Sequence, residues 1–305
     1  MSLPVLILVT RPVIGVPSDR IPGPGYHLAD AGAPQLSVLD LGVTRGDGVF
    51  ESVMVAAGRA PAIDAHLARF ADSAARLDLP VPEPLVWRAA FAAAVTEAGR
   101  AFPGASVLAV KLVLTRGVEG ATGGEPTGWL VAQPARDFSA ERRTGIRVVT
   151  LDRGYRHDVA QTSPWLLQGA KTLSYAINTA AVREAKRRGA DDVIFISSDG
   201  FVLEAPTASV LLRDGDRFFT PPAELGVLPG TTQRRAFEFL RSEGHETDAV
   251  RLRASELPRA DGLWLLSSIR QAVGVTELDG RPMPFDADLT ERLNASLSAT
   301  PTSAG

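Results

Sequence analysis

Lys171 is the first residue whose surroundings suggest chemistry. It follows a Gln-Gly-Ala step, at the point where a predicted loop enters a predicted amphipathic helix. A lysine amine attacks an aldehyde only when it is uncharged, and small or apolar neighbours lower its pKa. Ala170, Leu173 and Ile177 would supply such neighbours. The alternative is that Lys171 is a surface lysine that contributes only to solubility.

Glu204 is the second candidate, because it ends the short apolar run at residues 201–203 and is followed by Ala-Pro-Thr. A carboxylate here could simply close a hairpin. It could also keep a proton on the nitrogen of a pyridine ring, which makes such a ring an electron sink for a carbanion. Glu204 would serve a cofactor of that kind.

Three further segments carry groups that suit a phosphate. They are Arg69 in a predicted helix, Thr231 and Thr232 after Gly230 and before a helix expected from Gln233, and Ser267 with Ser268 after an expected strand at 263–266. N–H groups and hydroxyls at a helix start, with the positive end of the helix dipole behind them, favour a phosphate dianion. Each segment also has a plain structural explanation: a solvated helix residue, an N-cap, or the end of a strand.

The composition is that of an ordinary globular protein and excludes several classes of function. Of 305 residues, 45% are hydrophobic and 22% are charged, and the net charge of −3 gives no basic stripe for a nucleic acid. The absence of cysteine excludes disulfides, thiolate zinc sites and a cysteine nucleophile, and suits a reducing cytoplasm. The apolar run Leu3–Val9 is far below the roughly 20 residues that span a bilayer. We therefore expect a cytoplasmic protein with no metal site, and a buried strand at this run.

The first half of the chain predicts a small α/β domain over residues 1–134. A Pro/Gly-rich stretch at 12–34 is expected to be loop or strand edge. Apolar residues recur at helical spacing from Asp64, a plausible N-cap, to Leu77. Further elements are strands at 49–55, 106–114 and 128–133, and a helix at 85–100.

A polar stretch without clear periodicity predicts a linker at 135–143 and a larger domain at 144–305. A helix is expected from Leu173 to Arg188, with Ile177, Ala181 and Ala185 on one side and Gly189 as its C′ residue. Short strands are expected at 146–151, 192–197, 201–203, 209–212 and 217–220. Because Asp-Gly turns separate several of them, the pattern favours hairpins over βαβ units and an antiparallel, barrel-like sheet. A small, polar tail is expected from Asn294.

In this order the candidate segments match one family. From Leu41 to about Val275, roughly three quarters of the chain, the sequence resembles the fold-type IV pyridoxal-phosphate enzymes. These are branched-chain aminotransferases, D-amino acid aminotransferases and 4-amino-4-deoxychorismate lyases. The matching segments are residues 45–51 (Arg-Gly-Asp-Gly-Val-Phe-Glu), 66–69, 111–117, 169–171, 199–204, 228–232 and 266–268.

The resemblance implies an α+β protein of two domains, the larger with a barrel-like, antiparallel-rich sheet, and pyridoxal 5′-phosphate as cofactor. It implies that Lys171 is the Schiff-base lysine and proton shuttle and that Glu204 pairs with the pyridine nitrogen. It assigns the phosphate to a set of five residues: Arg69, Thr231, Thr232, Ser267 and Ser268. It also implies a homodimer with the site near the subunit interface, and no nucleic-acid or membrane partner.

Two features favour the lyase, which converts 4-amino-4-deoxychorismate to 4-aminobenzoate and pyruvate for folate synthesis. The sequence segments 46–51 and 171–175 are similar to the corresponding segments of the lyases. The Arg-x-His pair that D-amino acid aminotransferases place after the Thr-Arg-Gly turn is absent from residues 118–124, and Phe50 stands where those enzymes have a tyrosine. Aromatisation of the product supplies much of the driving force.

The residues that hold the substrate remain open. A dicarboxylate needs a cationic partner, and Arg45 and Arg116 rank above Arg156 and His157 for that role. Tyr175 lies close to where branched-chain enzymes use a tyrosine beside the cofactor, and a core-packing role is the alternative. The competing function is an aminotransferase acting on D-amino or branched-chain amino acids with 2-oxoglutarate. A non-catalytic protein on the same fold is disfavoured because Lys171 and Glu204 are both present.

Overall fold

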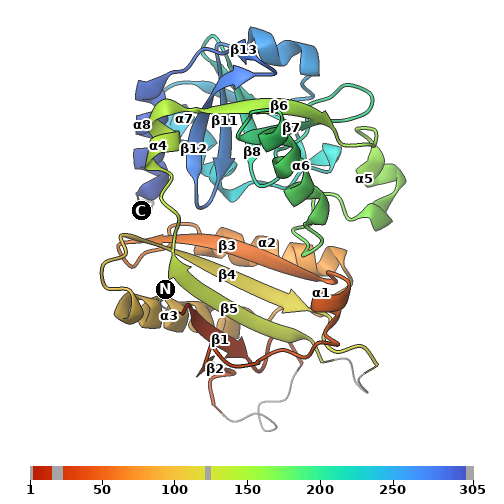
Figure 1. Ribbon diagram of the computed structural model, residues 1–305, viewed down its shortest axis with the longest axis vertical. Coiled ribbons are helices and arrows are strands. Elements are labelled where there is room, and N and C mark those ends of the chain that lie inside the picture. Colours follow the sequence, from red (N-terminus) through yellow and green to blue (C-terminus); the bar gives the residue numbers. More distant parts are fainter. Residues whose placement is uncertain (1–2, 16–22, 121–124, 300–305) are drawn as a thin grey trace. The chain divides into compact units, whose positions relative to one another are not determined.

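A computed structural model of the chain describes residues 3–15, 23–120 and 125–299. The chain divides into two compact units (Figure 1). Unit 1 is Met1–Arg136 together with Ala170–Tyr175, and unit 2 is Asp137–Gly169 together with Ala176–Gly305. The first change of unit falls inside the stretch expected to be a linker, whereas the return of residues 170–175 to unit 1 was not expected.

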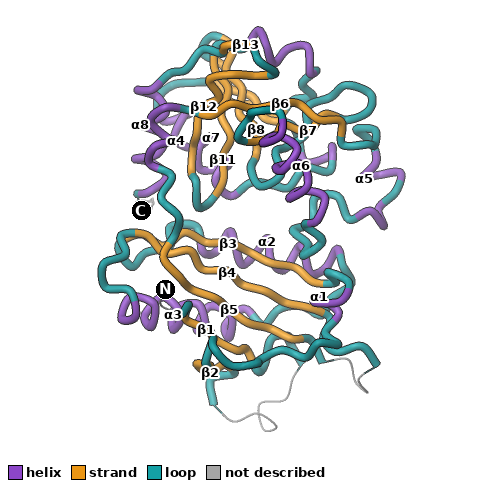
Figure 2. Tube along the Cα trace, viewed as in Figure 1, coloured by secondary structure: helices purple, strands orange, loops and turns teal. Residues whose placement is uncertain are grey.

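Unit 1 is built on a five-stranded antiparallel sheet of order β2-β1-β5-β4-β3 (Figure 2). Its strands are β1 (Val5–Val9), β2 (Tyr26–Ala29), β3 (Gly48–Ala56), β4 (Val107–Thr115) and β5 (Thr127–Pro134). Its helices are α1 (Leu41–Thr44), α2 (Ile63–Arg76) and α3 (Pro84–Ala101). Helix α2 packs on β3 and α3 on β1 and β5, and both lie behind the sheet in Figure 1. The expected strands and both long helices of this half are confirmed.

Strand β3 is the last strand in the order of the sheet. Its outer side, which faces away from β4, is nevertheless paired with another segment of the chain. Val49 forms an antiparallel bridge with Thr172. The Phe50 N–H donates to the Lys171 carbonyl at 3.0 Å, and the Leu173 N–H donates to the Gly48 carbonyl at 2.8 Å. An open edge would present a row of unpaired backbone groups. The segment 171–173 therefore completes the sheet of unit 1.

The start of α2 differs from the expectation. Its N-cap is Ala62, which makes no side-chain capping bond, and Asp64 lies inside the first turn. There its negative charge suits the positive end of the helix dipole, and its carboxylate pairs with Arg88. The preference of aspartate for helix starts was correct, but its position within the first turn was misjudged.

Unit 2 is built on a mixed sheet of order β10-β9-β8-β11-β12-β6-β7, with β13 paired to β12. Its strands are β6 (Ile146–Asp152), β7 (Asp192–Ile196), β8 (Ser209–Asp214), β9 (Arg217–Thr220), β10 (Glu246–Ala249), β11 (Gly262–Ser267), β12 (Gln271–Leu278) and β13 (Arg281–Pro282). Its α-helices are α4 (Ser139–Thr144), α5 (Val159–Thr162), α6 (Ala176–Arg187), α7 (Thr231–Ser242) and α8 (Ala287–Ser298). Its described residues also form the short 3-10 helices η1 (Pro164–Leu166), η2 (Ala223–Leu225) and η3 (Ala254–Arg259).

The pairing in unit 2 confirms part of the prediction and corrects the rest. The expected hairpin of β8 and β9 is antiparallel, as are β8 with β11 and β11 with β12. However, β6 pairs with β7 in parallel, with α6 between them in the chain, and β9 pairs with β10 in parallel across α7. The expectation of hairpins instead of βαβ units was therefore wrong at these two crossovers. In the expected strand 201–203, only Phe201 and Val202 form bridges, and these are isolated ones.

Helix α6 begins at Ala176, three residues later than expected. Leu173 cannot be helical because its N–H is bonded to β3. The expected apolar face is confirmed at Ala181 and Ala185, which are buried, and is wrong at Ile177, which is 64% exposed. Gly189, with φ of +76°, ends the helix as expected.

The polar tail expected from Asn294 was wrong up to Ser298, and residues 300–305 lie outside the described residues. Asn294 lies within α8, and its side-chain amide both donates to and accepts from the backbone of Ala272 at 2.9 Å. The buried residues Leu289, Leu293 and Leu297 hold α8 on the core of unit 2. Among the described residues, no helix has the length and apolarity that a membrane span requires.

Candidate active site

Lys171 is held by its backbone in a segment that pairs with β3, whereas the sequence predicted a loop there that enters a helix at Leu173. Its carbonyl accepts from the Phe50 N–H on β3, and its own N–H donates to Ser73 Oγ on α2 at 3.1 Å. Ser73 is buried, with 2% of its surface exposed. The main chain at Lys171 is therefore fixed by a strand and a helix of the same unit.

Aromatic rings surround the Lys171 amine. Its Nζ lies 4.6 Å from the centre of the Phe50 ring and 5.8 Å from that of Tyr175. The two rings meet edge to face, with centroids 5.1 Å apart. The apolar setting expected for this amine thus comes from Phe50 and Tyr175, whereas Ile177 is an exposed residue of unit 2.

Lys111 is a residue of this site that the sequence reasoning missed. Its Nζ also lies 4.6 Å from the centre of the Phe50 ring, so two amines share one ring. Burial lowers the pKa of Lys111, although part of the side chain is exposed. The sequence does contain a signal for Lys111, because it is a single lysine within the otherwise apolar strand 107–115.

Arg69 is part of a buried ionic cluster with Glu51 of β3 and His66 of α2. Arg69 Nε donates to Glu51 Oε1 at 2.7 Å, and Nη2 donates to Oε2 at 2.9 Å. His66 Nδ1 lies 2.7 Å from the same Oε2. The side chains of Glu51, His66 and Arg69 are 0%, 2% and 12% exposed. Burial alone would raise the pKa of Glu51, but its hydrogen bond to His66 and the Arg69 charge outweigh this and bring it to about 2.

The two arginines proposed for the substrate have different surroundings. Arg45 is largely exposed and pairs with Glu119 at 3.3 Å. Arg116 donates to both carboxylate oxygens of Asp47, at 2.7 and 3.2 Å, and to the carbonyls of Leu77 and Asp78 after α2. These bonds give Arg116 a structural role at the end of α2, so we do not assign it to the substrate. Arg45 stays a prediction.

The backbone of Glu204 has the hairpin role considered for it, and its role at a pyridine nitrogen stays a prediction. Its carbonyl accepts from the Phe195 N–H at 2.9 Å, so its backbone closes a hairpin with β7. Its side chain is separately oriented, because Oε2 accepts from the Leu228 N–H at 3.1 Å. Burial and the negative charge of Glu204 raise the pKa of Tyr155, against the opposing effect of Arg153. Tyr155 is thus an electrostatic neighbour of Glu204 that the sequence did not reveal.

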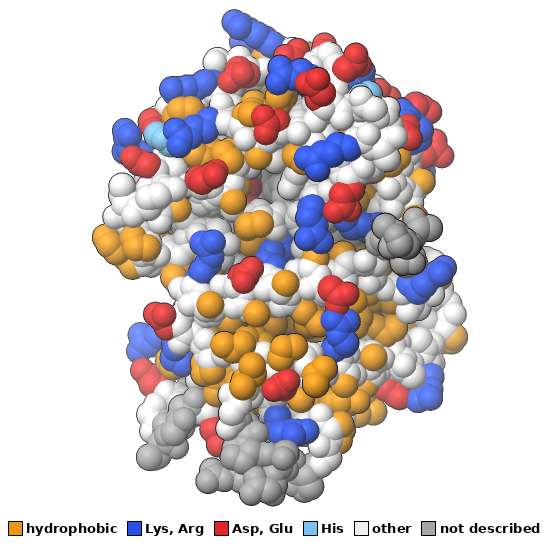
Figure 3. Space-filling model, turned by 180° about the vertical axis from the view of Figure 1, so that it is seen from behind, with side chains coloured by type: hydrophobic (Ala, Val, Ile, Leu, Met, Phe, Trp, Pro, Cys, Tyr) orange, Lys and Arg blue, Asp and Glu red, His pale blue; other side chains and the backbone are white. Residues whose placement is uncertain are grey.

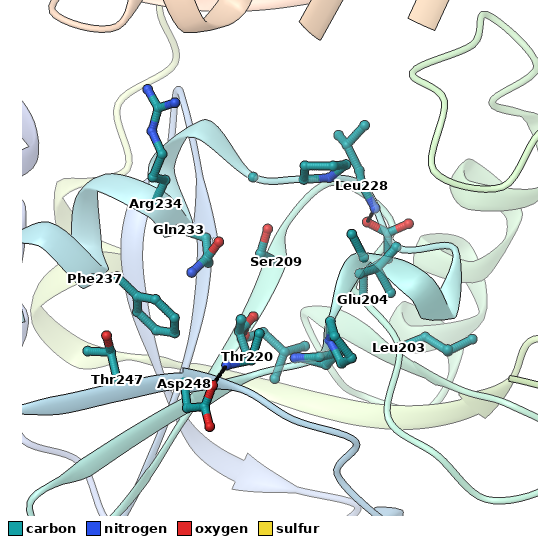
Figure 4. A pocket seen from close by; sticks show the side chains of 18 of the residues that line it. Leu203, Glu204, Ser209, Thr220, Leu228, Gln233, Arg234, Phe237, Thr247 and Asp248 are labelled. Carbon is teal, nitrogen blue, oxygen red and sulfur yellow. Dashed lines mark hydrogen bonds between the residues drawn. The ribbon is translucent and has the colours of Figure 1, made fainter. Parts of the chain in front are cut away.

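Glu204 also lines a cavity of about 530 Å³ inside unit 2 (Figure 4). The wall includes Ser209 of β8, Leu228, Gly230 and Gln233 of α7. Figure 4 shows Glu204 beside Leu228 on one side of this cavity and Gln233 and Arg234 on the other. Of the predicted cofactor residues, Glu204 lines it, whereas Thr231, Thr232, Ser267 and Ser268 do not. This cavity is therefore not in itself the predicted phosphate site.

The predicted phosphate residues of unit 2 lie at two neighbouring element ends. Helix α7 begins at Thr231, two residues before the expected start, and its N-cap Gly230 makes no side-chain capping bond. Ser267 ends β11, and Ser268 begins the turn to β12. Strand β8 lies beside both ends. Its Ser209 pairs with Leu266 of β11, and a Cβ added at Gly230 would lie only 2.3 Å from Ser209 Oγ.

Comparison with known proteins identifies the family. The family model for amino-transferase class IV matches residues 48–278, so the chain belongs to this family. A bifunctional aminodeoxychorismate lyase / D-amino acid transaminase of Mycobacterium tuberculosis is 44% identical over 85% of this chain and 91% of its own length. A fold IV transaminase structure from Curtobacterium pusillum is 52% identical, covers 97% of each chain and has a TM-score of 0.93. The PLP-bound form of a hypothetical aminotransferase from Mycobacterium tuberculosis is 37% identical, covers 96% of this chain and 98% of its own, and has a TM-score of 0.85.

These comparisons confirm the predicted family, the fold class and pyridoxal 5′-phosphate as the cofactor. The chemistry of the side chains fits that group. Unit 1 offers an amine beside two aromatic rings and an oriented arginine, while unit 2 offers an oriented carboxylate and a helix start without a side-chain cap. The role of each individual residue stays a prediction.

The buried cluster predicts a specific response to acid. The pKa of Glu51 is about 2 in the folded chain, against an ordinary value of 4.5. Its contribution to stability is therefore complete above pH 4.5 and is lost as the pH falls through about 2. We expect the unfolding free energy of the wild type to fall across this window by on the order of 3 kcal/mol more than that of Glu51→Gln, measured by urea unfolding at each pH.

Asp64→Asn is the control, because the Asp64 side chain is 78% exposed. It should leave the slope of the wild type nearly unchanged. Parallel curves for the wild type and Glu51→Gln would show that Glu51 does not carry this contribution.

Proposed function

We propose that the protein is a lyase that converts 4-amino-4-deoxychorismate to 4-aminobenzoate and pyruvate. The observation that carries the proposal is the pair of amines, Lys111 and Lys171, on the ring of Phe50. One amine would hold the cofactor, and the other would present a positive charge to a substrate carboxylate nearby. The bifunctional relative from Mycobacterium tuberculosis, 44% identical, is named for this activity together with D-amino acid transamination.

The roles of the residues follow from their chemistry. Pyridoxal 5′-phosphate, when bound, supplies an electron sink for the carbanion formed at the substrate α-carbon. Lys171 would carry it covalently through Nζ and, once freed by the substrate, would remove the α-proton. Glu204 would keep the pyridine nitrogen protonated, with its carboxylate aimed by the Leu228 N–H. Arg69, with the hydroxyls and N–H groups of Thr231, Thr232, Ser267 and Ser268, would hold the phosphate.

Two features of Lys171 suit a proton shuttle. Its backbone is bonded to both β3 and α2, so motion is confined to the side chain. Phe50 and Tyr175 flank the amine and would exclude water from the proton that it moves. Loss of pyruvate then leaves an aromatic ring, so elimination needs little further machinery.

Transamination of D-amino acids is the second candidate function. The same relative is named for both a lyase and a D-amino acid transaminase activity, and both reactions share the first proton transfer. They differ in whether a proton returns to the cofactor carbon or a leaving group departs. We rank the lyase first because its amino substrate carries two carboxylates, which a second cation beside Phe50 suits, whereas D-alanine carries one.

We also propose a homodimer, as the family resemblance implies. Unit 1 exposes several large apolar side chains, among them Val38 at 78% and Leu85 at 76%. Hydrophobic side chains gather on the face of unit 1 that is seen in Figure 3. Such patches are typical of protein interfaces. Sedimentation of the purified protein should give twice the mass of 32.3 kDa, and a monomer at all concentrations would overturn this proposal.

The cofactor role of Lys171 is tested by absorbance. Purified wild type should be yellow, because pyridoxal 5′-phosphate bound covalently through Lys171 absorbs in the visible range. Lys171→Ala should lose this band, since no covalent bond forms, whereas Lys186→Ala in the last turn of α6 should keep it. A colourless wild type that cannot be reconstituted, or a Lys171→Ala variant that keeps the band, would contradict the assignment.

The reaction is tested by product. Wild type supplied with 4-amino-4-deoxychorismate should release 4-aminobenzoate, and Lys111→Met should raise KM about tenfold or more, because the loss of a charge-assisted contact costs roughly 1.5 to 3 kcal/mol. The visible band of this variant should persist. In the half-reaction with D-alanine alone, followed by the loss of the visible band, Lys111→Met should retain most of any transaminase activity. Transamination without release of 4-aminobenzoate would exclude the lyase.

A further inference from the structure

Glu51 and His66 have no part in the proposed reaction, yet both are buried and form an ionic cluster with Arg69. Burying charges is costly, and an apolar replacement of similar volume often stabilises a protein as well or better. Strand β3 is buried along most of its length, so a carboxylate in it is unusual. A role in holding Arg69 would explain why charged groups occupy this position.

The geometry of the pair fixes the plane of the guanidinium. Glu51 uses both oxygens on the Nε and Nη2 edge of Arg69, at 2.7 and 2.9 Å. A fork of this kind restrains both the position and the rotation of the group. The second contact to Oε2, from His66 Nδ1 at 2.7 Å, restrains the carboxylate in turn.

The same two elements also hold the backbone of Lys171. On α2, His66, Arg69 and Ser73 recur at helical spacing and share one face. Ser73 Oγ accepts from the Lys171 N–H, while Glu51 on β3 directly follows Phe50, whose N–H donates to the Lys171 carbonyl. Arg69 and the backbone of Lys171 are therefore fixed in one frame by β3 and α2.

We propose that Glu51 and His66 are positioning residues that orient Arg69 toward the phosphate of the cofactor. The inference rests on the proposed role of Arg69. The pair sets the direction of the guanidinium before the phosphate arrives, so that binding requires little reorganisation. His66 acts through Glu51, and Glu51 acts through Arg69.

A merely structural role predicts something different. If the cluster only stabilised unit 1, its disruption would weaken the binding of any form of the cofactor equally. Pyridoxal, which lacks the phosphate, separates the two cases, because Arg69 has no phosphate to meet in that ligand. The informative quantity is the ratio of the Kd for pyridoxal to the Kd for pyridoxal 5′-phosphate.

The experiment measures this ratio by absorbance titration of the full-length protein after removal of the cofactor. We expect Arg69→Met to lower the ratio most and Glu51→Gln to lower it about tenfold, by analogy with the 10- to 100-fold effects of supporting residues at metal sites. His66→Leu should lower the ratio by less. His66→Gln should restore part of the loss, because its amide can still donate to Glu51. The ³¹P NMR line of the bound phosphate should shift in the same variants.

Asp47→Asn is the matched control. Asp47 binds the Nε and Nη2 edge of Arg116 with the same fork, at 2.7 and 3.2 Å, in the same unit. Its replacement should leave the ratio of the two Kd values unchanged, whatever it does to stability.

The outcomes separate the two claims. A lowered ratio in Arg69→Met and in the Glu51 or His66 variants supports the inference. A lowered ratio in Arg69→Met alone overturns the inference and leaves the phosphate role of Arg69 standing. An unchanged ratio in Arg69→Met overturns that role as well, and with it the inference. If Glu51→Gln does not fold, the two His66 variants decide: equal loss of both ligands in His66→Leu means that the cluster is structural only.

Discussion

The pairing of residues 171–173 with the edge of β3 is the interaction on which the arrangement of unit 1 depends. Two backbone hydrogen bonds, from Phe50 to Lys171 and from Leu173 to Gly48, hold the segment. Both ends of the segment continue into unit 2, so the chain leaves unit 2 only to complete this sheet. Backbone bonds therefore place the main chain of Lys171 independently of its side chain.

The alternation of β3 extends this constraint to the rest of the site. Successive side chains of a strand point to opposite faces. Phe50 contacts the Lys171 amine, and the next residue, Glu51, contacts α2 and holds Arg69. One strand thus positions an amine on one face and a guanidinium on the other. A shift of register by one residue would exchange these faces and separate both groups from their partners.

Much of the fold and of the candidate site could be predicted from the sequence, because the signals are local. The periodicity of α2 and α3, the Asp-Gly turns and the order of the motifs were all readable. The start of α6 was misplaced at Leu173, because the helical periodicity of the sequence extends over residues 173–175. Residues 171–173 pair instead with β3, which lies far away in the sequence. The parallel pairs of unit 2 were missed for the same reason, since strand order is a long-range property. Lys111 was overlooked because its neighbour Phe50 lies on another strand.

The shared machinery explains why the sequence motifs identify the family more firmly than the reaction. In the roles proposed above, Lys171, Glu204 and the phosphate residues would serve a first proton transfer that the lyase and the aminotransferase have in common. The later steps of the reaction depend on the substrate that is held, and hence on charge near the reacting carbon. In unit 1 we propose Lys111 for that charge, because its amine lies at the ring of Phe50 that also contacts Lys171. Because burial lowers the pKa of Lys111, a bound carboxylate would favour its charged form and be held by it in return. A substrate with a second carboxylate gains from this contact, whereas a small D-amino acid with one does not need it.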